Sequence, residues 1–423
     1  MFHRRAGRRP KAPRILATVA TLGMLITGGP VASADPSSPP SPSIDASAPT
    51  PTAPYPAGPP QGFGPDGITI GGPGLDTRAR VQAPGTPALP GGIDAKGWVI
   101  ADATSGQILA AQDPHGRYYP ASTLKLLTMT TLYPLLDPNQ ILTATHEDAS
   151  VEGSRVGIVE NGQYTVAQLW NALVLQSGND AAQMLAEGAG GVSKSLSLMN
   201  AKAKELQAYD TIAGTVSGLD VSGQSSSPYD LCIFLREIIS NPATLKIAGE
   251  LTGQLPPVPP KYGPLNYSTQ DKLLTHQYPG ALGGKTGFTD AARHTFVGAA
   301  AQNGRTLIVS LMQAEQTPVQ TWQQAAALLD WGFSTPATTS GLGKLVVPGE
   351  VSEQPASVSE SIGSSAPALS DGAGTPVAET TPRSHGVPLW PAIPILVLLV
   401  GGAIWIAAPV HSKNKKKPKD RRH

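Results

Sequence analysis

The sequence predicts an α+β domain in which one antiparallel sheet is assembled from both ends of the domain. Near the start, the apolar runs 98–101 and 107–110 flank the turn Thr104-Ser105-Gly106, which is a strand, turn, strand pattern. Near the end, 295–301 and 306–312 flank a turn that contains Asn303-Gly304, a strong hairpin signal. Apolar residues at helical spacing then predict a terminal helix over 319–331.

A mainly helical region is inserted between these two groups of strands. Thr165 and Gln168 have the spacing of a capping box, and the apolar residues Leu169, Leu173 and Val174 follow as one helix face. The expected fold is therefore an antiparallel sheet flanked by helices, with a mainly helical subdomain. A cleft between two such parts is a natural place for a site.

Composition shows that this domain occupies only part of the chain. The 423 residues include 46 glycines and 42 prolines, about a fifth of the total, which is too many for one continuously packed globule. Fifteen prolines lie between residues 35 and 90, so 35–91 is expected to be a Pro-rich disordered arm. Residues 337–386 are similarly rich in Ser, Pro and Ala and predict a low-complexity stalk. The domain is placed at 92–336.

Both ends of the chain carry targeting signals. Six basic residues precede an apolar run and the small residues Ala32-Ser33-Ala34, which predicts a cleaved signal peptide over 1–34, with an uncleaved anchor as the alternative. Residues 387–410 are 24 positions without a charge, long enough for a transmembrane helix. The tail 411–423 carries seven Lys and Arg, which the positive-inside rule keeps in the cytoplasm. The domain is then expected on the extracytoplasmic side of the membrane.

Charge and ligand-type residues exclude several function classes. Between residues 35 and 412 there are 18 Lys and Arg against 29 Asp and Glu, a poor balance for binding nucleic acid. The single Cys232 excludes an internal disulfide and is expected as a buried apolar filler. No pair of histidines has metal-ligand spacing, so no metal and no cofactor are implied and a zinc peptidase is disfavoured.

Three short motifs could join in one chemistry. Helical spacing puts Ser122 and Lys125 on one face, where a desolvated amine could take the proton of the serine. Ser177 and Asn179 follow on a turn, and Lys285-Thr286-Gly287 reads as a strand whose glycine lets a ligand approach closely. Each motif alone is more often an ordinary surface helix, a capped turn or an edge strand.

The ordered combination resembles the penicillin-recognising serine enzymes. The chain looks especially like the low-molecular-mass penicillin-binding proteins of the actinobacterial, membrane-tethered kind, which act as D-alanyl-D-alanine carboxypeptidases. The resemblance covers about residues 93–335 and includes the segments 217–220, 226–231 and 272–280. It implies a β-lactamase/transpeptidase-like fold, peptidoglycan stem peptides ending in D-Ala-D-Ala as substrate, and a single-pass protein of the bacterial cell membrane.

The resemblance also implies roles for individual residues. Ser122 would be the nucleophile, Lys125 its base, and Ser177 the proton relay to the departing D-Ala. The substrate would be bound by Asn179, Lys285, Thr286, Gly287 and Phe288, with the backbone N–H groups of Ser122 and Phe288 holding the oxyanion. β-Lactams would acylate Ser122 as covalent inhibitors.

The chain departs from the family pattern at two places. Ala292-Arg293-His294 and Gln270-Asp271 replace the more usual residues, which puts substrate contacts in doubt and leaves the assistance of Arg293 and His294 open. A β-lactamase is disfavoured because no Glu-x-x-Leu-Asn pattern lies between Asn179 and Lys285. A DD-endopeptidase and a non-catalytic β-lactam sensor remain alternatives.

Overall fold

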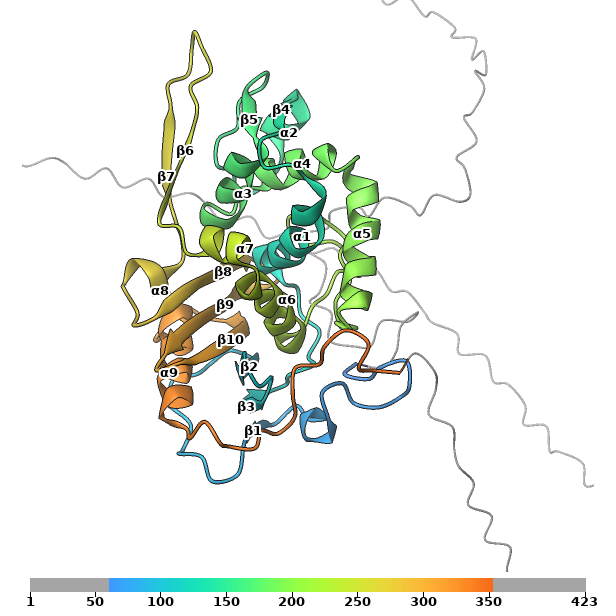
Figure 1. The fold of residues 1–423 in the computed structure, drawn as a ribbon, viewed down its shortest axis with the longest axis vertical. Helices are drawn as coiled ribbons and strands as arrows, with labels where there is room; N and C mark the ends of the chain where they lie inside the picture. The colour runs from blue at the N-terminus through green and yellow to red at the C-terminus, as the bar shows by residue number, and fades with distance from the viewer. Residues whose placement is uncertain (1–60, 353–423) are drawn as a thin grey trace, which may run out of the picture. The chain divides into compact units, whose positions relative to one another are not determined.

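The computed structural model describes residues 61–352, which form an antiparallel sheet, helices on both of its faces and a helical region at one end (Figure 1). The 6-stranded sheet has the order β1-β3-β2-β10-β9-β8, with every neighbouring pair antiparallel. Its strands are β1 (Arg80–Gln82), β2 (Gly97–Asp102), β3 (Ile108–Gln112), β8 (Ala281–Thr289), β9 (Arg293–Gln302) and β10 (Arg305–Ala314). Both predicted hairpins are confirmed, as is the assembly of the sheet from the two ends of the domain.

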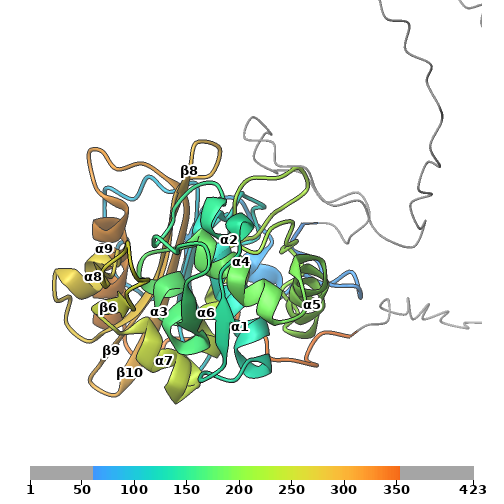
Figure 2. The same ribbon diagram turned by 90° about the horizontal axis from the view of Figure 1, so that it is seen from above.

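Two helices pack on the sheet. The terminal helix α9 (Thr321–Ser334) contacts β2, β9 and β10, and buries Leu328 and Leu329 in a cluster with Trp98 and Phe296. The helix α6 (Pro228–Ser240) contacts the same strands and belongs to a second core cluster with α1 and α3. Figures 1 and 2 show the two helices on opposite faces. The predicted Cys232 filler is confirmed, because its thiol is buried in α6.

The helical region lies between β3 and α6 in sequence. Its longer helices are α1 (Lys125–Leu132), α3 (Val166–Leu175), α4 (Asn179–Gly188) and α5 (Val192–Glu205). The predicted capping box is present at the start of α3. Thr165 Oγ1 accepts from the Gln168 backbone N–H, and Gln168 Oε1 accepts from the Thr165 backbone N–H. The fold class predicted from the sequence is therefore correct.

Shorter elements complete the domain. The hairpin formed by β6 and β7 projects from the body next to α8, and short helices and strands connect the longer helices (Figure 1). These elements are η1 (Pro73–Leu75), η2 (Ala121–Leu124), η3 (Tyr133–Leu135), β4 (Ile141–Thr143), α2 (His146–Ser150), β5 (Gln163–Thr165), α7 (Pro242–Ala248), β6 (Thr252–Leu255), β7 (Leu265–Ser268) and α8 (Lys272–Thr275).

The ordered domain is longer than the predicted 92–336 at both ends. Within the expected disordered arm, β1 pairs with β3, and the backbone N–H of Gly62 donates to Asp210. Within the expected stalk, Leu345 and Val346 are buried, and the Tyr229 hydroxyl bonds to the backbone on both sides of Leu345. The sequence did not predict these segments, because their high proline content indicated disorder. Single buried residues and backbone pairing also leave no periodic apolar pattern. A fragment limited to 92–336 would lose all of these contacts.

The other predicted segments lie outside the described residues. These are the signal peptide 1–34, the first part of the arm, the rest of the stalk, the transmembrane helix 387–410 and the basic tail 411–423. Among residues 61–352, no helix combines the length and the apolar character that crossing a bilayer requires.

Candidate active site

Ser122 lies in the tight turn η2, immediately before α1 begins at Lys125. The preceding residue, Ala121, has a φ of 47°, a left-handed conformation that is unusual for a residue with a Cβ. The backbone at Ala121 and Ser122 is closely packed against Gly218, since a Cβ on that glycine would lie 1.8 Å from the Ala121 carbonyl oxygen. Strained backbone of this kind clusters at functional sites, where the surrounding structure holds it in place.

The amine of Lys125 lies at the centre of the site. Its Nζ donates to Ser122 Oγ at 2.9 Å, to Asn179 Oδ1 at 2.7 Å and to the Ser217 carbonyl at 2.7 Å. The side chain is fully buried, and burial, with the nearby Lys285 ammonium as a second cause, holds the pKa of Lys125 well below its usual value. The lowered pKa favours the neutral amine, which is the form that can accept the proton of Ser122 across this distance.

Ser177 and Asn179 lie where the chain turns from α3 into α4. Ser177 has a φ of 61°, and its buried hydroxyl has no hydrogen-bond partner among the described residues. Asn179 is the first residue of α4, and its Nδ2 donates to the Glu152 carbonyl at 2.7 Å. Asn179 thus joins Lys125 to the loop between α2 and β5.

The third motif lies on β8, the edge strand of the sheet. Gly287 passes so close to the nucleophile that a Cβ on it would be 2.8 Å from the Ser122 backbone nitrogen. Lys285 is buried, and burial lowers its pKa to about 7, partly offset by the charge of Asp271. Burial in turn raises the pKa of Asp271 to about 6. The Lys285 amine donates to the Thr286 carbonyl at 2.8 Å.

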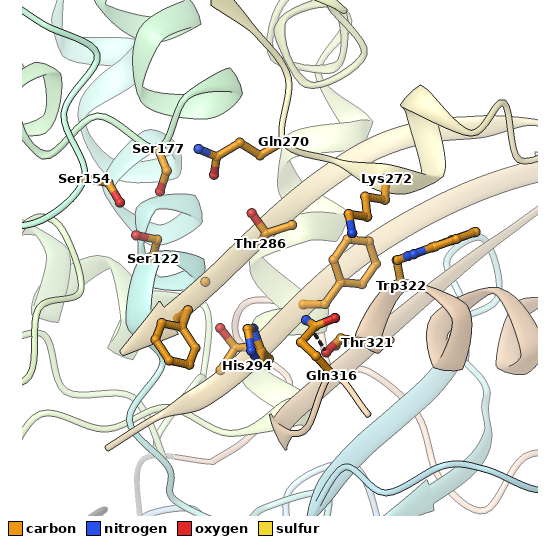
Figure 3. A pocket seen from close by; sticks show the side chains of 14 residues that line it. Ser122, Ser154, Ser177, Gln270, Lys272, Thr286, His294, Gln316, Thr321 and Trp322 are labelled. Carbon is orange, nitrogen blue, oxygen red and sulfur yellow. Dashed lines mark hydrogen bonds between the residues drawn. The ribbon is translucent and has the colours of Figure 1, made fainter. Parts of the chain in front are cut away.

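A cavity of about 300 Å³ opens over these groups. Ser122, Ser154 and Ser177 lie together at one end of it, and Thr286 lies between them and the far end (Figure 3). Lys125 and Lys285 are buried and are not among the residues that line it. The residues that line it are Ser122, Ser154, Ser177, Gln270, Lys272, Thr286, Gly287, Phe288, His294, Thr295, Phe296, Gln316, Thr321 and Trp322.

The sequence left open whether Arg293 and His294 assist at the site, and the structure places only His294 in the cavity lining. His294 lines the cavity and stacks on Phe288, with ring centroids 4.5 Å apart. Arg293 is absent from the lining, because its guanidinium forms two hydrogen bonds with the Glu315 carboxylate, at 3.0 and 2.9 Å. Its central carbon lies 5.6 Å from the Phe288 ring centroid. Arg293 therefore packs against the rim rather than facing the cavity.

Sequence reasoning missed several contributors to the site. The Ser217 carbonyl accepts from Lys125, a backbone contact that no residue type signals. The buried Asp180 accepts from the backbone N–H groups of Val156, Gly157 and Ile158, and so holds the loop that brings Ser154 to the cavity. An acidic residue directly after Ser177-Gly178-Asn179 was the available signal for Asp180.

The fold and these side chains define a class: serine hydrolases with the fold of penicillin-binding proteins and transpeptidases. A family model described as D-alanyl-D-alanine carboxypeptidase matches residues 80–316, more than half of the chain, and the chain belongs to this family. The resemblance drawn from the three motifs is thereby confirmed.

Individual relatives agree with this placement. The chain is 42% identical over 261 residues to D-alanyl-D-alanine carboxypeptidase DacB2 of Mycobacterium tuberculosis, covering 60% of this chain and 88% of that protein. It is 33% identical over 279 residues to DacD of Salmonella typhimurium, covering 63% and 68%. A crystal structure of a D-alanyl-D-alanine carboxypeptidase from M. tuberculosis superposes with a TM-score of 0.59 at 41% identity, over 62% of this chain and 99% of that one.

Proposed function

We propose that this chain removes the terminal D-Ala from peptidoglycan stem peptides through an acyl-enzyme on Ser122. Membership of the D-alanyl-D-alanine carboxypeptidase family supports the substrate class. The observation that carries the chemistry is the buried, pKa-lowered amine of Lys125 at 2.9 Å from Ser122 Oγ. A serine hydroxyl is a weak nucleophile until an adjacent base accepts its proton.

Acylation follows from the positions of three side chains. Ser122 Oγ transfers its proton to Lys125 Nζ and attacks the carbonyl carbon of the penultimate D-Ala. The backbone N–H groups of Ser122 and Phe288 stabilise the oxyanion, which Gly287 permits by allowing β8 so close to Ser122. As the C–N bond breaks, the Ser177 hydroxyl, which has no hydrogen-bond partner among the described residues, passes its proton to the departing nitrogen and takes up the proton held by Lys125. Water then hydrolyses the ester and restores Ser122.

Substrate recognition is assigned to the β8 motif and to Asn179. The Lys285 amine and the Thr286 hydroxyl bind the terminal carboxylate, since a charge-assisted hydrogen bond is about twice as strong as a neutral one. Asn179 holds Lys125 through Oδ1 and lies beside the acyl part of the peptide. A carboxylate on the leaving group is therefore required for efficient cleavage.

β-Lactams would acylate Ser122 in the same way and leave slowly. The residues that line the cavity include no carboxylate among those the structure describes, so none of them can activate water by the route that a glutamate provides in class A β-lactamases. A long-lived penicilloyl adduct is the expected product.

We also propose the location of the enzyme. The features that support it are the basic and apolar start with its small-residue cleavage pattern at 1–34, the 24 uncharged residues 387–410, and the basic tail 411–423. Together they favour an exported domain tethered to the bacterial cell membrane by one C-terminal helix. Labelling from outside intact cells, before and after removal of residues 387–423, would test this topology.

The catalytic proposal is tested on the purified full-length protein. Incubation with diacetyl-L-Lys-D-Ala-D-Ala should release D-Ala, and mass spectrometry of a penicillin-treated sample should find the adduct on the peptide that contains Ser122. Ser122→Ala should abolish both signals while keeping the thermal midpoint. Peptide cleavage that survives in Ser122→Ala would refute the nucleophile, and an adduct without D-Ala release would favour a sensor.

A further inference from the structure

Two chain segments from outside the predicted domain lie against each other on its surface. They are the arm segment, residues 61–76, and the stalk segment, residues 341–352. The backbone N–H of Lys344 donates to the Gly71 carbonyl at 2.9 Å and so joins them directly. Figure 1 shows the arm segment in blue and the stalk segment in orange, next to each other at the lower end of the view.

His115 fastens the arm segment to the domain. Its buried ring has Nδ1 at 2.9 Å from Asp210 Oδ2 and Nε2 at 3.0 Å from the Ile70 carbonyl oxygen. An ionised carboxylate and a carbonyl only accept hydrogen bonds, and a neutral imidazole has one N–H group, so both bonds form only with the doubly protonated ring. Asp210 Oδ1 also accepts from the Gly62 backbone N–H at 3.1 Å. One ion pair thus holds the arm segment at two points.

Tyr229 connects this ion pair to the stalk segment. Its ring lies against the His115 ring, with centroids 4.6 Å apart. Its hydroxyl donates to the Lys344 carbonyl at 2.7 Å and accepts from the Val346 backbone N–H at 2.9 Å. The side chains of His115, Asp210 and Tyr229, called the clasp below, therefore contact both segments and each other.

The groups around His115 favour its protonated form. Burial alone would lower the pKa of His115, but the hydrogen bond and charge of Asp210 outweigh burial, and the Asp230 carboxylate acts in the same direction, so the pKa lies above its usual value. Burial, followed by the charge of Asp210, raises the pKa of Asp230 to about 7, so Asp230 gains its charge near neutral pH and favours the protonated ring further. The other titratable or charged side chains near the ring are Asp113, Arg117 and Tyr229 of the domain and Asp76 and Arg78 across a cavity of about 280 Å³ that the ring borders.

We propose that the clasp is a pH-dependent latch, which holds the arm segment against the domain and the stalk segment in acid and releases it as the pH rises. When His115 loses a proton, the adjacent Asp210 carboxylate keeps the remaining one on Nδ1. Nε2 then presents a lone pair to the Ile70 carbonyl oxygen, so two acceptors face each other at 3.0 Å and the bond to the arm segment is lost.

The sign of the effect follows from the direction of the pKa shift. A histidine whose pKa is raised in the folded state stabilises that state in acid, and this contribution is lost as the pH rises through the raised pKa. The latch is therefore closed at and below pH 6.5 and opens above it. An opened arm segment adds its own extended length, at most about 55 Å, to the reach of the chain that precedes it.

Amide hydrogen exchange on the full-length protein tests the latch. Rates are divided by the intrinsic exchange rate at each pH, so the protection that remains reports opening of the segment. Protection of the arm segment should fall about tenfold between pH 6 and pH 9, as the loss of one hydrogen bond predicts, while β9 and β10 keep theirs. Histidine NMR on the same protein should find that His115 titrates at the midpoint of this fall. Constant protection of the arm segment, or an equal fall in β9 and β10, would overturn the proposal.

Variants assign the fall in protection to the clasp. His115→Gln offers an amide that does not titrate, so the arm segment should lose its pH dependence, whereas His146→Gln, at an exposed histidine of α2, should keep it. Persistence of the full pH dependence in His115→Gln would refute the role of His115.

Tyr229→Phe keeps the ring against His115 and removes both hydroxyl bonds to the stalk segment. The stalk segment should then lose protection at every pH, while the arm segment keeps the midpoint of the wild type. An arm segment that no longer responds to pH in Tyr229→Phe would place the switch in the stalk contacts and overturn the latch. This variant and the wild-type titration decide the question even if His115→Gln fails to fold, which its thermal midpoint shows.

Discussion

The buried carboxylate of Asp210 accepts hydrogen bonds from side chains of opposite charge, whereas the buried amine of Lys125 forms hydrogen bonds only with neutral groups. Asp210 accepts from His115 Nδ1 at 2.9 Å and from Arg117 Nε at 3.0 Å, and all three side chains are at most 5% exposed. Lys125 is equally buried, but its partners are a hydroxyl, an amide oxygen and a backbone carbonyl. One domain thus buries ionisable side chains in two ways, with and without a hydrogen-bond partner of opposite charge.

The pKa shifts follow these two environments. Burial alone would lower the pKa of His115 and raise that of Asp210, but their mutual hydrogen bond and charges outweigh burial and shift each pKa the other way. At the other site burial prevails, and the pKa values of Lys125 and Lys285 fall. The paired charges stabilise the fold, while burial at the other site favours the neutral form of Lys125, which is the form that could accept the proton of Ser122.

The largest expected effect comes from removing the unpaired amine. Lys125→Met keeps the length of the side chain and removes the base, so D-Ala release should fall about 10³- to 10⁴-fold. Because no charged partner is stranded, the thermal midpoint should change little. Lys246→Met, on the exposed side of α7, serves as the matched control and should keep full activity. If Lys125→Met kept more than a tenth of wild-type activity, Lys125 would not be the base that accepts the proton of Ser122.

The paired cluster should respond in the opposite way. Asp210→Asn removes the carboxylate to which both His115 and Arg117 donate and leaves Asp230 as a nearby carboxylate, so the free energy of unfolding should fall by about 3–5 kcal/mol. At a temperature where the variant is still folded, kcat should match the wild type. Urea unfolding measures the loss, with Glu205→Gln, which breaks the exposed pair with Lys202, as a control that shifts by less than about 1 kcal/mol. An Asp210→Asn protein with the wild-type free energy of unfolding would show that the hydrogen bonds of Asp210 with His115 and Arg117 do not stabilise the fold.

The sequence alone predicted much of the reactive site and little of the paired cluster. Ser122, Lys125, Ser177, Asn179 and the β8 motif form short patterns in a fixed order, and the structure brings them together within one site. Each is recognisable because the chemistry restricts residue type and spacing at once.

His115, Arg117 and Asp210 could not be predicted, because their pairing depends on contacts up to 95 residues apart in sequence and on no motif. The same holds for the Ser217 carbonyl and for the packed parts of the arm and stalk. There a backbone group or a single buried side chain makes the contact, and one chain without periodicity gives no signal for it. Helix and strand positions were predictable where apolar spacing repeats, as in β9, β10 and α9.

Ser177, whose backbone is in the left-handed region, provides a third test of the comparison. Its replacement by glycine should raise stability and lower activity. Glycine adopts the left-handed conformation of Ser177, with φ 61°, without steric cost, so Ser177→Gly should raise the free energy of unfolding by about 1 kcal/mol. Loss of the relay should lower kcat about 10²-fold.

Asn303 supplies the matched control for this variant. It has a φ of 51° in the turn between β9 and β10, away from the cavity lining. Asn303→Gly should therefore stabilise the fold slightly and leave kcat unchanged. Equal kcat in Ser177→Gly and the wild type would show that the left-handed serine is a feature of the turn and not of the reaction.

The smallest effect is expected from pH, through the second buried amine. Lys285 has a pKa lowered to about 7, so it is charged below that pH and loses its proton as pH rises through it. The carboxylate of the substrate then loses its cation, and kcat/KM should fall about fivefold between pH 7 and pH 8, as expected for one group with a pKa of about 7. Bound carboxylate favours the protonated amine, so the fall should appear in KM rather than in kcat.

Protonation of Lys125 should produce the opposite limb at lower pH, because a charged amine cannot accept the proton of Ser122. Lys285→Arg separates the two limbs. A guanidinium keeps its charge throughout this range, so the alkaline fall should disappear while the acid limb stays. An alkaline fall that persists in Lys285→Arg would mean that another group titrates there, and Lys285 would then not be the group that holds the carboxylate.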